Sequence, residues 1–164
     1  MVGHTHSSYG YCHQVMGRYW LDLTKEDVMW NISDVGWAKN SWSTIFGPWS
    51  QGSTVFIHGM KKFQPEQVLA TLEKYPISVL CAPPALYRSM VQFDLKNWTF
   101  GSLRHCVSAG EPLNVETIYN WEEGTSHVIK QGYGQTESTL LIGNFKVISS
   151  WGQNGGGNDF HSRK

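Results

Sequence analysis

Short runs of apolar residues alternate with amphipathic segments along most of this chain. A run of about four to eight apolar-rich residues, bounded by glycine or polar residues, is typical of a strand buried on both faces of a sheet. Runs of this kind predict strands at residues 27–33, 54–58, 78–82, 103–107 and 127–130.

The segments between these strands carry helix signals. Pro65 suits the first turn of a helix, where no backbone N–H is needed. Val68, Leu69 and Leu72 then form one apolar stripe, and Pro76 ends the pattern. Helices are therefore expected at residues 7–19, 65–74 and 84–90, and from Pro112 onward.

Repeated strand-then-helix units predict an α/β fold with a mostly parallel sheet and helices on both faces. In such folds, ligands bind in loops at the carboxyl ends of the strands. After Leu141 the pattern gives way to a polar, glycine-rich tract at residues 149–158 that cannot bury enough apolar surface to become ordered. The expected organisation is one domain at 1–145 and a disordered tail at 146–164.

Composition removes several classes of function. The 13 basic and 13 acidic residues balance, which argues against nucleic acid or an anionic membrane as a partner. The three cysteines form no CxxC pair, which is typical of a reducing compartment. No run approaches the roughly 20 apolar residues of a transmembrane helix, and the first residues lack the features of a targeting peptide.

Two predicted strand-end loops, 108–113 and 131–137, combine residues that suit a nucleotide. Their glycines allow close approach of the backbone to a ligand, and Tyr133 offers a flat face for a base. Thr136 offers a hydroxyl, and Glu137 a hard oxygen ligand for Mg²⁺. The same residues are also ordinary turn and helix-cap chemistry, so composition alone leaves both interpretations open.

The five residues 133–137, Tyr-Gly-Gln-Thr-Glu, resemble the Y-G-x-T-E signature of adenylate-forming enzymes, and their spacing from Ser108–Glu111 is also similar. Three further segments look like acetyl-CoA synthetase relatives, above all the mitochondrial medium-chain acyl-CoA synthetases: 31–37, 47–49 and 82–88. The resemblance covers roughly residues 1–145. It identifies this stretch as a partial AMP-binding domain, the N-terminal domain of the adenylate-forming fold.

The resemblance implies a reaction. Enzymes of this family join a carboxylate to ATP, which gives an acyl-AMP and pyrophosphate, and the thiol of coenzyme A then displaces AMP. For this chain it implies ATP, Mg²⁺ and coenzyme A, with medium-chain fatty acids as small-molecule substrates. It also implies the mitochondrial matrix as location, and it leaves the oligomeric state open.

The resemblance assigns site residues as well. Gly110 and Glu111 are expected on the adenine and ribose side, and Tyr133 against adenine. Thr136 is expected to bond the α-phosphate and Glu137 to hold Mg²⁺, which makes these two the expected catalytic residues. The full nucleotide-binding set is Gly110, Glu111, Gln131, Gly132, Tyr133, Gly134, Gln135 and Thr136.

Trp37 lies where the family places a large residue beside the acyl pocket, so its volume is expected to limit acyl-chain length. A tryptophan of the ordinary core fits the sequence equally well. Gln131-Gly132 departs from the acidic or asparagine residue and the small residue that relatives carry before the tyrosine.

Other parts of the family pattern are absent from this sequence: the phosphate loop before its first residues, the T-G-D motif, and the C-terminal domain with its catalytic lysine. Loss of such electrostatic contributions predicts impaired or absent activity for this chain. Two alternatives follow, a non-catalytic adenine-nucleotide or acyl-binding module and an unstable splice remnant. The tail from about Ser149 is expected to be foreign to the family, as a splice end would be.

Overall fold

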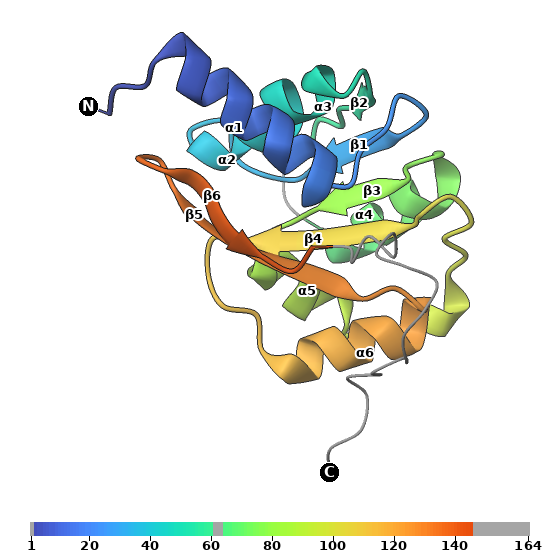
Figure 1. Cartoon of the computed structure of the whole chain (residues 1–164). Helices are drawn as coiled ribbons and strands as arrows, with labels where there is room; N and C mark the ends of the chain where they lie inside the picture. The colour runs from blue at the N-terminus through green and yellow to red at the C-terminus, as the bar shows by residue number, and fades with distance from the viewer. Residues whose placement is uncertain (1, 61–63, 146–164) are drawn as a thin grey trace, which may run out of the picture.

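The computed structural model describes residues 2–60 and 64–145, and these residues form an α/β structure built on one sheet (Figure 1). The strand order is β2-β1-β3-β4-β5-β6. Neighbouring strands from β2 to β5 are parallel, and β5 and β6 are antiparallel, which confirms the predicted mostly parallel sheet. The strands are β1 Val28–Asn31, β2 Thr54–Phe56, β3 Val79–Cys81, β4 His105–Ala109, β5 Ile129–Gln135 and β6 Thr139–Gly143.

Helices cover both faces of this sheet, as predicted (Figure 1). One face carries α1 His6–Tyr19, α2 Ala38–Asn40, the π-helix η1 Ser41–Phe46 and α3 Gly47–Ser50. The other carries α4 Pro65–Lys74, α5 Pro84–Met90, the 3₁₀-helix η2 Leu95–Asn97 and α6 Val115–Thr125. The bounds of α4 agree with the helix predicted at 65–74, because Pro65 and the apolar stripe act locally.

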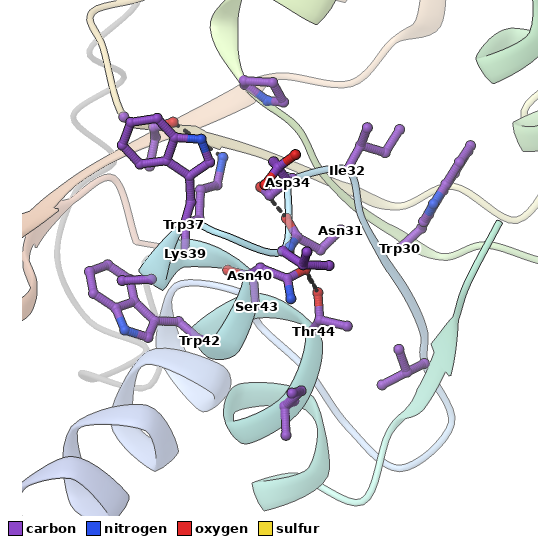
Figure 2. Close-up of a pocket in the computed structure, with 18 of the residues that line it drawn as sticks. Trp30, Asn31, Ile32, Asp34, Trp37, Lys39, Asn40, Trp42, Ser43 and Thr44 are labelled. Atoms are coloured by element: carbon purple, nitrogen blue, oxygen red, sulfur yellow. Dashed lines mark hydrogen bonds between the residues drawn. The ribbon is translucent and has the colours of Figure 1, made fainter. Parts of the chain in front are cut away.

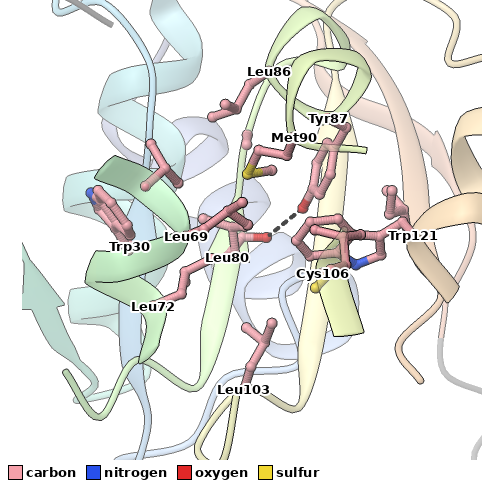
Figure 3. Close-up of a cluster of buried hydrophobic side chains, with 14 of the residues drawn as sticks. Trp30, Leu69, Leu72, Leu80, Leu86, Tyr87, Met90, Leu103, Cys106 and Trp121 are labelled. Carbon is pink, nitrogen blue, oxygen red and sulfur yellow. Dashed lines mark hydrogen bonds between the residues drawn. The ribbon is translucent and has the colours of Figure 1, made fainter. Parts of the chain in front are cut away.

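The face covered by α4, α5 and α6 holds the larger hydrophobic cluster (Figure 3). Trp30, Leu80 and Cys106 point to this face from three neighbouring strands. The fully buried Tyr87 packs edge-on against Trp121, and its hydroxyl lies 3.4 Å from the Leu80 carbonyl oxygen, to which it donates. Burial raises the pKa of the Cys106 thiol to about 12, so this cysteine is a packing residue and not a nucleophile.

The opposite face packs mainly against α1, and Trp20 joins that helix to the end of the sheet. Its indole is 2% exposed and donates to the Gln131 carbonyl oxygen over 3.3 Å. A Cβ atom at Gly132 would lie 2.6 Å from the Trp20 ring, and one at Gly143 would lie 2.9 Å from it. These two glycines therefore allow the indole to lie directly on β5 and β6.

The hairpin of β5 and β6 corrects one prediction. Residues 131–135, expected in a loop, continue the predicted strand 127–130 as β5 and pair with β6. The glycines that resemble a loop instead allow close contacts, because a Cβ atom at Gly134 would lie 2.2 Å from the Thr139 carbonyl oxygen. Of the predicted loop, Thr136 and Glu137 lie in a turn.

The start of α6 corrects a second prediction. A helix was expected from Pro112, but α6 begins at Val115, after the N-cap residue Asn114. The N–H of Leu113 donates to the side-chain oxygen of Gln131 over 3.0 Å, and Leu113 is buried. This hydrogen bond to β5 holds residues 112–114 in a non-helical conformation. Because its partner lies 18 residues away, the local sequence could not predict it. Similarly, β4 runs to Ala109, so Ser108 and Ala109 belong to a strand and not to the predicted loop.

An ion pair between the buried Asp27 and the more exposed Arg104 closes the end of the sheet opposite to the carboxyl ends of its parallel strands. Asp27 accepts from Arg104 at 2.6 Å and 2.8 Å, and from Ser78 and Thr24. Burial opposes ionisation of this carboxyl, but the hydrogen bonds from Arg104, Ser78 and Thr24 outweigh it and hold the pKa of Asp27 well below its ordinary value.

This depressed pKa predicts a stability change in acid. A carboxyl whose pKa is lower in the folded chain stabilises it above the ordinary pKa of about 3.9, and loses that contribution as the pH falls through the folded value. We expect Asp27→Asn to remove about 1–2 kcal/mol at pH 7, because the 36% exposed Arg104 side chain is partly screened by water. Urea unfolding at pH 7 and below pH 3 measures this. A difference between wild type and variant that stays constant with pH would contradict the account.

Candidate functional site

The order of the strands creates a crevice at their carboxyl ends. After β1 the chain crosses to β2 on one side, and it then returns past β1 to β3 on the other side. The segment that follows β1 leads into α2 and η1 on one face, whereas the segment that follows β3 leads into α5 on the other. In open α/β sheets, ligands bind where connections diverge in this way.

A cleft of about 1360 Å³ lies in this position (Figure 2). Residues that follow the parallel strands β1 to β4, together with the last residues of β5, contribute to its walls. They include Ile32–Val35 after β1, Ile57 and His58 after β2, Pro83 and Pro84 after β3, Gly110 and Glu111 after β4, and Gly134–Thr136 at the end of β5. The cleft is therefore assembled by the sheet as a whole.

Part of the cleft wall is apolar. Trp30, Ile32, Ile45 and Phe56 contribute to it, and Trp37, which has 72% of its surface exposed, also lines the cleft. Among the described residues Trp37 is thus not part of the hydrophobic core. Apolar walls of this kind suit a hydrocarbon chain.

A chain of polar side chains fixes η1 against the end of β1. The Asn31 amide donates to the Thr44 hydroxyl over 2.9 Å, and Thr44 donates to the Asn40 side chain over 3.0 Å. Ser33 in turn donates to the Asn31 side-chain oxygen over 3.1 Å. These bonds hold the wider turn of the π-helix beside the cleft, and such π turns are frequent at functional sites.

The loop after β4 also lines the cleft. Gly110 has φ +112°, a conformation that favours glycine, and lines the cleft. Glu111 also lines the cleft, and its carboxylate pairs with Arg88 of α5 at 3.1 Å. The pair is about half exposed, so it orients Glu111 and adds little stability.

A second, smaller cleft of about 480 Å³ shares this loop with the larger one. Tyr133 lines it with 53% of its surface exposed, so its ring is accessible to a ligand. The predicted nucleotide-binding residues that line this cleft are Gly110, Glu111, Gln131, Gly132, Tyr133 and Gly134. Those that line the larger cleft are Gly110, Glu111, Gly134, Gln135 and Thr136.

The turn after β5 places the two predicted catalytic residues differently. Thr136 lines the larger cleft, and its carbonyl oxygen lies 2.6 Å from the His4 ring nitrogen at the start of the chain. Glu137 is exposed and lies outside the linings of both clefts. The contact with His4 holds the turn from outside the sheet and was not predicted.

Metal-ligating side chains do not gather in the described part of the chain, where no three His, Cys, Asp or Glu residues converge. Mg²⁺, however, commonly binds through one or two carboxylates together with substrate phosphates. An exposed Glu137 beside Thr136 fits that second mode.

Sequence reasoning missed two polar features of the larger cleft. Lys39 of α2 lines it and donates from its amine to the Ala109 carbonyl oxygen over 3.2 Å. Arg88, quoted above as part of the segment 82–88, orients Glu111. The two contacts join residues 70 and 23 positions apart in the sequence, so no local sequence pattern could have revealed them.

We compared the sequence with models of known protein families. The family model of the AMP-binding enzymes matches residues 1–157. The chain belongs to the AMP-binding enzyme family. As an AMP-binding family member it resembles the mouse acyl-coenzyme A synthetase ACSM3, mitochondrial, with 53% identity over 146 residues. The rat acyl-coenzyme A synthetase ACSM4, mitochondrial, is 46% identical over the same length.

These matches cover 89% of the chain and 25% of each relative, so the chain spans about a quarter of the curated relatives' length. The crystal structure of the anthranilate CoA ligase AuaEII in complex with anthranoyl-AMP is similar, with a TM-score of 0.78 and 27% identity. That match covers 87% of this chain and 28% of the ligase. The predicted family and its adenylate-forming fold are thereby confirmed. Within the described ranges, no helix has both the length and the hydropathy to cross a membrane.

Proposed function

We propose that this chain forms the nucleotide- and acyl-binding part of an AMP-forming acyl-CoA synthetase that activates medium-chain fatty acids. One observation carries the proposal: a single cleft joins the loops that carry the adenylate-forming motif to an apolar wall lined by Trp30, Ile32 and Phe56. An acyl-AMP needs both surfaces next to each other. The sheet brings them together because residues at the carboxyl ends of its parallel strands meet at one edge.

On this proposal the smaller cleft takes the adenine base. Tyr133 provides an aromatic face, while Gly110 and Gly134 let backbone approach the ring. The side chain of Gln131 contributes indirectly, since its oxygen is already engaged by the Leu113 N–H. Its role is to hold the loop 110–113 at the correct distance from β5.

Thr136, which lines the larger cleft, and the exposed Glu137 beside it lie in the turn after β5. The Thr136 hydroxyl is proposed to bond the α-phosphate, and Glu137 to supply a carboxylate oxygen to Mg²⁺ that arrives with ATP. Such an ion neutralises charge on the phosphates. These residues bind and orient the nucleotide, and the fatty acid lies against the apolar wall of the larger cleft, which Trp37 also lines.

Coenzyme A and a location in the mitochondrial matrix complete the proposal. The names of the relatives, which are mitochondrial acyl-coenzyme A synthetases, support coenzyme A and a mitochondrial location, and the matrix is our proposal within that location. Activity of the present chain by itself is a separate matter from this assignment, because the chain spans about a quarter of those proteins. Binding experiments therefore test the site more directly than turnover does.

The proposal predicts that a stable acyl-adenylate mimic binds more tightly than either of its halves. We expect the sulfamoyl analogue of octanoyl-AMP to bind the purified chain at least about tenfold more tightly than AMP or octanoate alone, because one ligand then fills both surfaces. Isothermal titration calorimetry of the three ligands measures this.

A shortened analogue provides the control. The acetyl version keeps the nucleotide half but leaves most of the apolar wall empty, so it is expected to bind no better than about AMP itself. Equal affinity for the octanoyl and acetyl analogues would show that the apolar wall is not the acyl site.

A further inference from the structure

We propose that Lys39 is the anchor for the fatty acid carboxylate, a positioning residue that selects acids over neutral amphiphiles of the same length. This inference rests on the proposed function, because it names a contact inside the cleft assigned above to the acyl group. It concerns a side chain outside the adenylate-forming motif and outside the residues expected from the sequence.

The position of Lys39 marks the boundary between the two parts of the cleft. It lies on α2, and Figure 2 shows its side chain beside Trp37, on the other side of the view from Trp30 and Ile32. Its amine reaches across to the Ala109 carbonyl oxygen, 3.2 Å away, at the end of β4. Ala109 is followed directly by Gly110 and Glu111 of the nucleotide loop. The amine thus lies where a hydrocarbon tail would end and the nucleotide would begin.

The charge on Lys39 has no anionic partner among the described residues. No ion pair within 4.0 Å joins it to an acid there. Glu111 is paired with Arg88, and one Asp34 carboxylate oxygen accepts from the Gly36 N–H over 2.8 Å. An ammonium carries three donors, and the carbonyl of Ala109 accounts for one. Two donors and a full positive charge are therefore free to meet an anion.

A carboxylate with an apolar tail fits this arrangement. Its tail can lie against Trp30 and Ile32 while its head accepts a charge-assisted hydrogen bond from Lys39. Without such a partner, moving a carboxylate from water to the edge of an apolar wall is unfavourable, and the group would become protonated. Lys39 therefore keeps the carboxylate ionised beside the nucleotide loop, which is the form that attacks the α-phosphorus.

The inference predicts a selective loss of affinity. We expect Lys39→Met to weaken octanoate binding to the full chain by about tenfold or more, the size expected for one charge-assisted hydrogen bond. Binding of 1-octanol is expected to change by less than about twofold, because methionine keeps most of the apolar stem. Calorimetry gives the two affinities, and the carboxyl shift of [1-¹³C]octanoate reports contact with the ammonium directly.

Three further variants sharpen this test. Lys39→Arg keeps the charge and is expected to retain most octanoate binding. Asp34→Asn removes a negative charge from the cleft without changing shape, so octanoate should bind more tightly. Lys25→Met makes the same change as the test variant on a side chain that is 82% exposed at the other end of β1, and octanoate affinity should not change.

The outcomes separate the inference from the proposed function. Unchanged octanoate affinity in Lys39→Met, or equal losses for octanoate and octanol, would overturn the carboxylate anchor and leave the acyl cleft in place. A loss of AMP affinity with octanoate affinity retained would assign the ammonium to a phosphate instead, which also overturns it. Failure of the wild-type chain to bind either octanoate or octanol would contradict the proposed function itself.

Discussion

Trp20→Ala is expected to lower the free energy of unfolding by about 3–5 kcal/mol, the usual cost of truncating a fully buried aromatic side chain. Small domains are stable by about 5–15 kcal/mol in total, so this one change removes a large part of the margin. Trp20 also packs on Gly132 and Gly143, and its indole bonds the Gln131 carbonyl oxygen. The loss should therefore extend to the hairpin of β5 and β6.

Two measurements check this expectation. Urea unfolding followed by circular dichroism gives the change in stability, and hydrogen exchange gives the protection of the hairpin amides. Trp37→Ala is the matched control, since it removes the same atoms from a side chain that is 72% exposed and should cost less than about 1 kcal/mol. Equal effects of the two variants would show that Trp20 does not join α1 to the sheet.

Features of the fold that depend on local chemistry could be predicted from the sequence. The bounds of α4 follow from Pro65 and one apolar stripe, and β1 and β3 follow from short apolar runs. Both signals lie within a few residues of the element that they specify. Parallel pairing then follows from the alternation of strands and helices.

Features that depend on contacts between distant residues could not be predicted. The glycines of residues 131–135 are typical of a loop, yet these residues form a strand that pairs with β6. The missing side chains leave room for the Trp20 ring and for the backbone of β6. The π-helix η1 depends on a network between Asn31, Asn40 and Thr44 across two elements. The prediction of a tail at 146–164 after a domain at 1–145 concerns a segment outside the described residues.

The candidate site shows the same division. The motif residues were identified from their resemblance to a family, and the sheet brings most of them to two adjoining clefts. Which of the two clefts each residue lines, and that Glu137 lines neither, could be seen only in the three-dimensional structure. Lys39 has no motif of its own, because its role depends on the Ala109 carbonyl oxygen at the far side of the crevice.

The second large effect concerns the turn after β5. Thr136→Ala combined with Glu137→Ala is expected to weaken binding of ATP with Mg²⁺ by at least about tenfold, because it removes a hydroxyl donor and a metal ligand together. Both residues are exposed, so the global fold should remain intact. Unchanged unfolding in urea confirms that the variant is folded.

A neighbouring substitution controls for disturbance of the turn. Ser138→Ala changes the same turn at a residue that has no proposed contact with the phosphates or Mg²⁺ and whose hydroxyl donates to the Thr139 carbonyl oxygen, so nucleotide binding should remain at the wild-type value. The double variant and this control change the same turn, but only the double variant removes the proposed contacts with phosphate and Mg²⁺. Equal losses in both would indicate a change of conformation and not loss of ligands.

The most direct test of the central claim is a calorimetric titration of the purified chain with ATP and Mg²⁺, after cooperative unfolding has been demonstrated. The account predicts saturable binding with one site per chain, which is lost or strongly weakened in the Thr136→Ala, Glu137→Ala variant. A folded chain that binds no nucleotide, or that binds it equally well in the double variant, would contradict the assignment of these clefts as the nucleotide site.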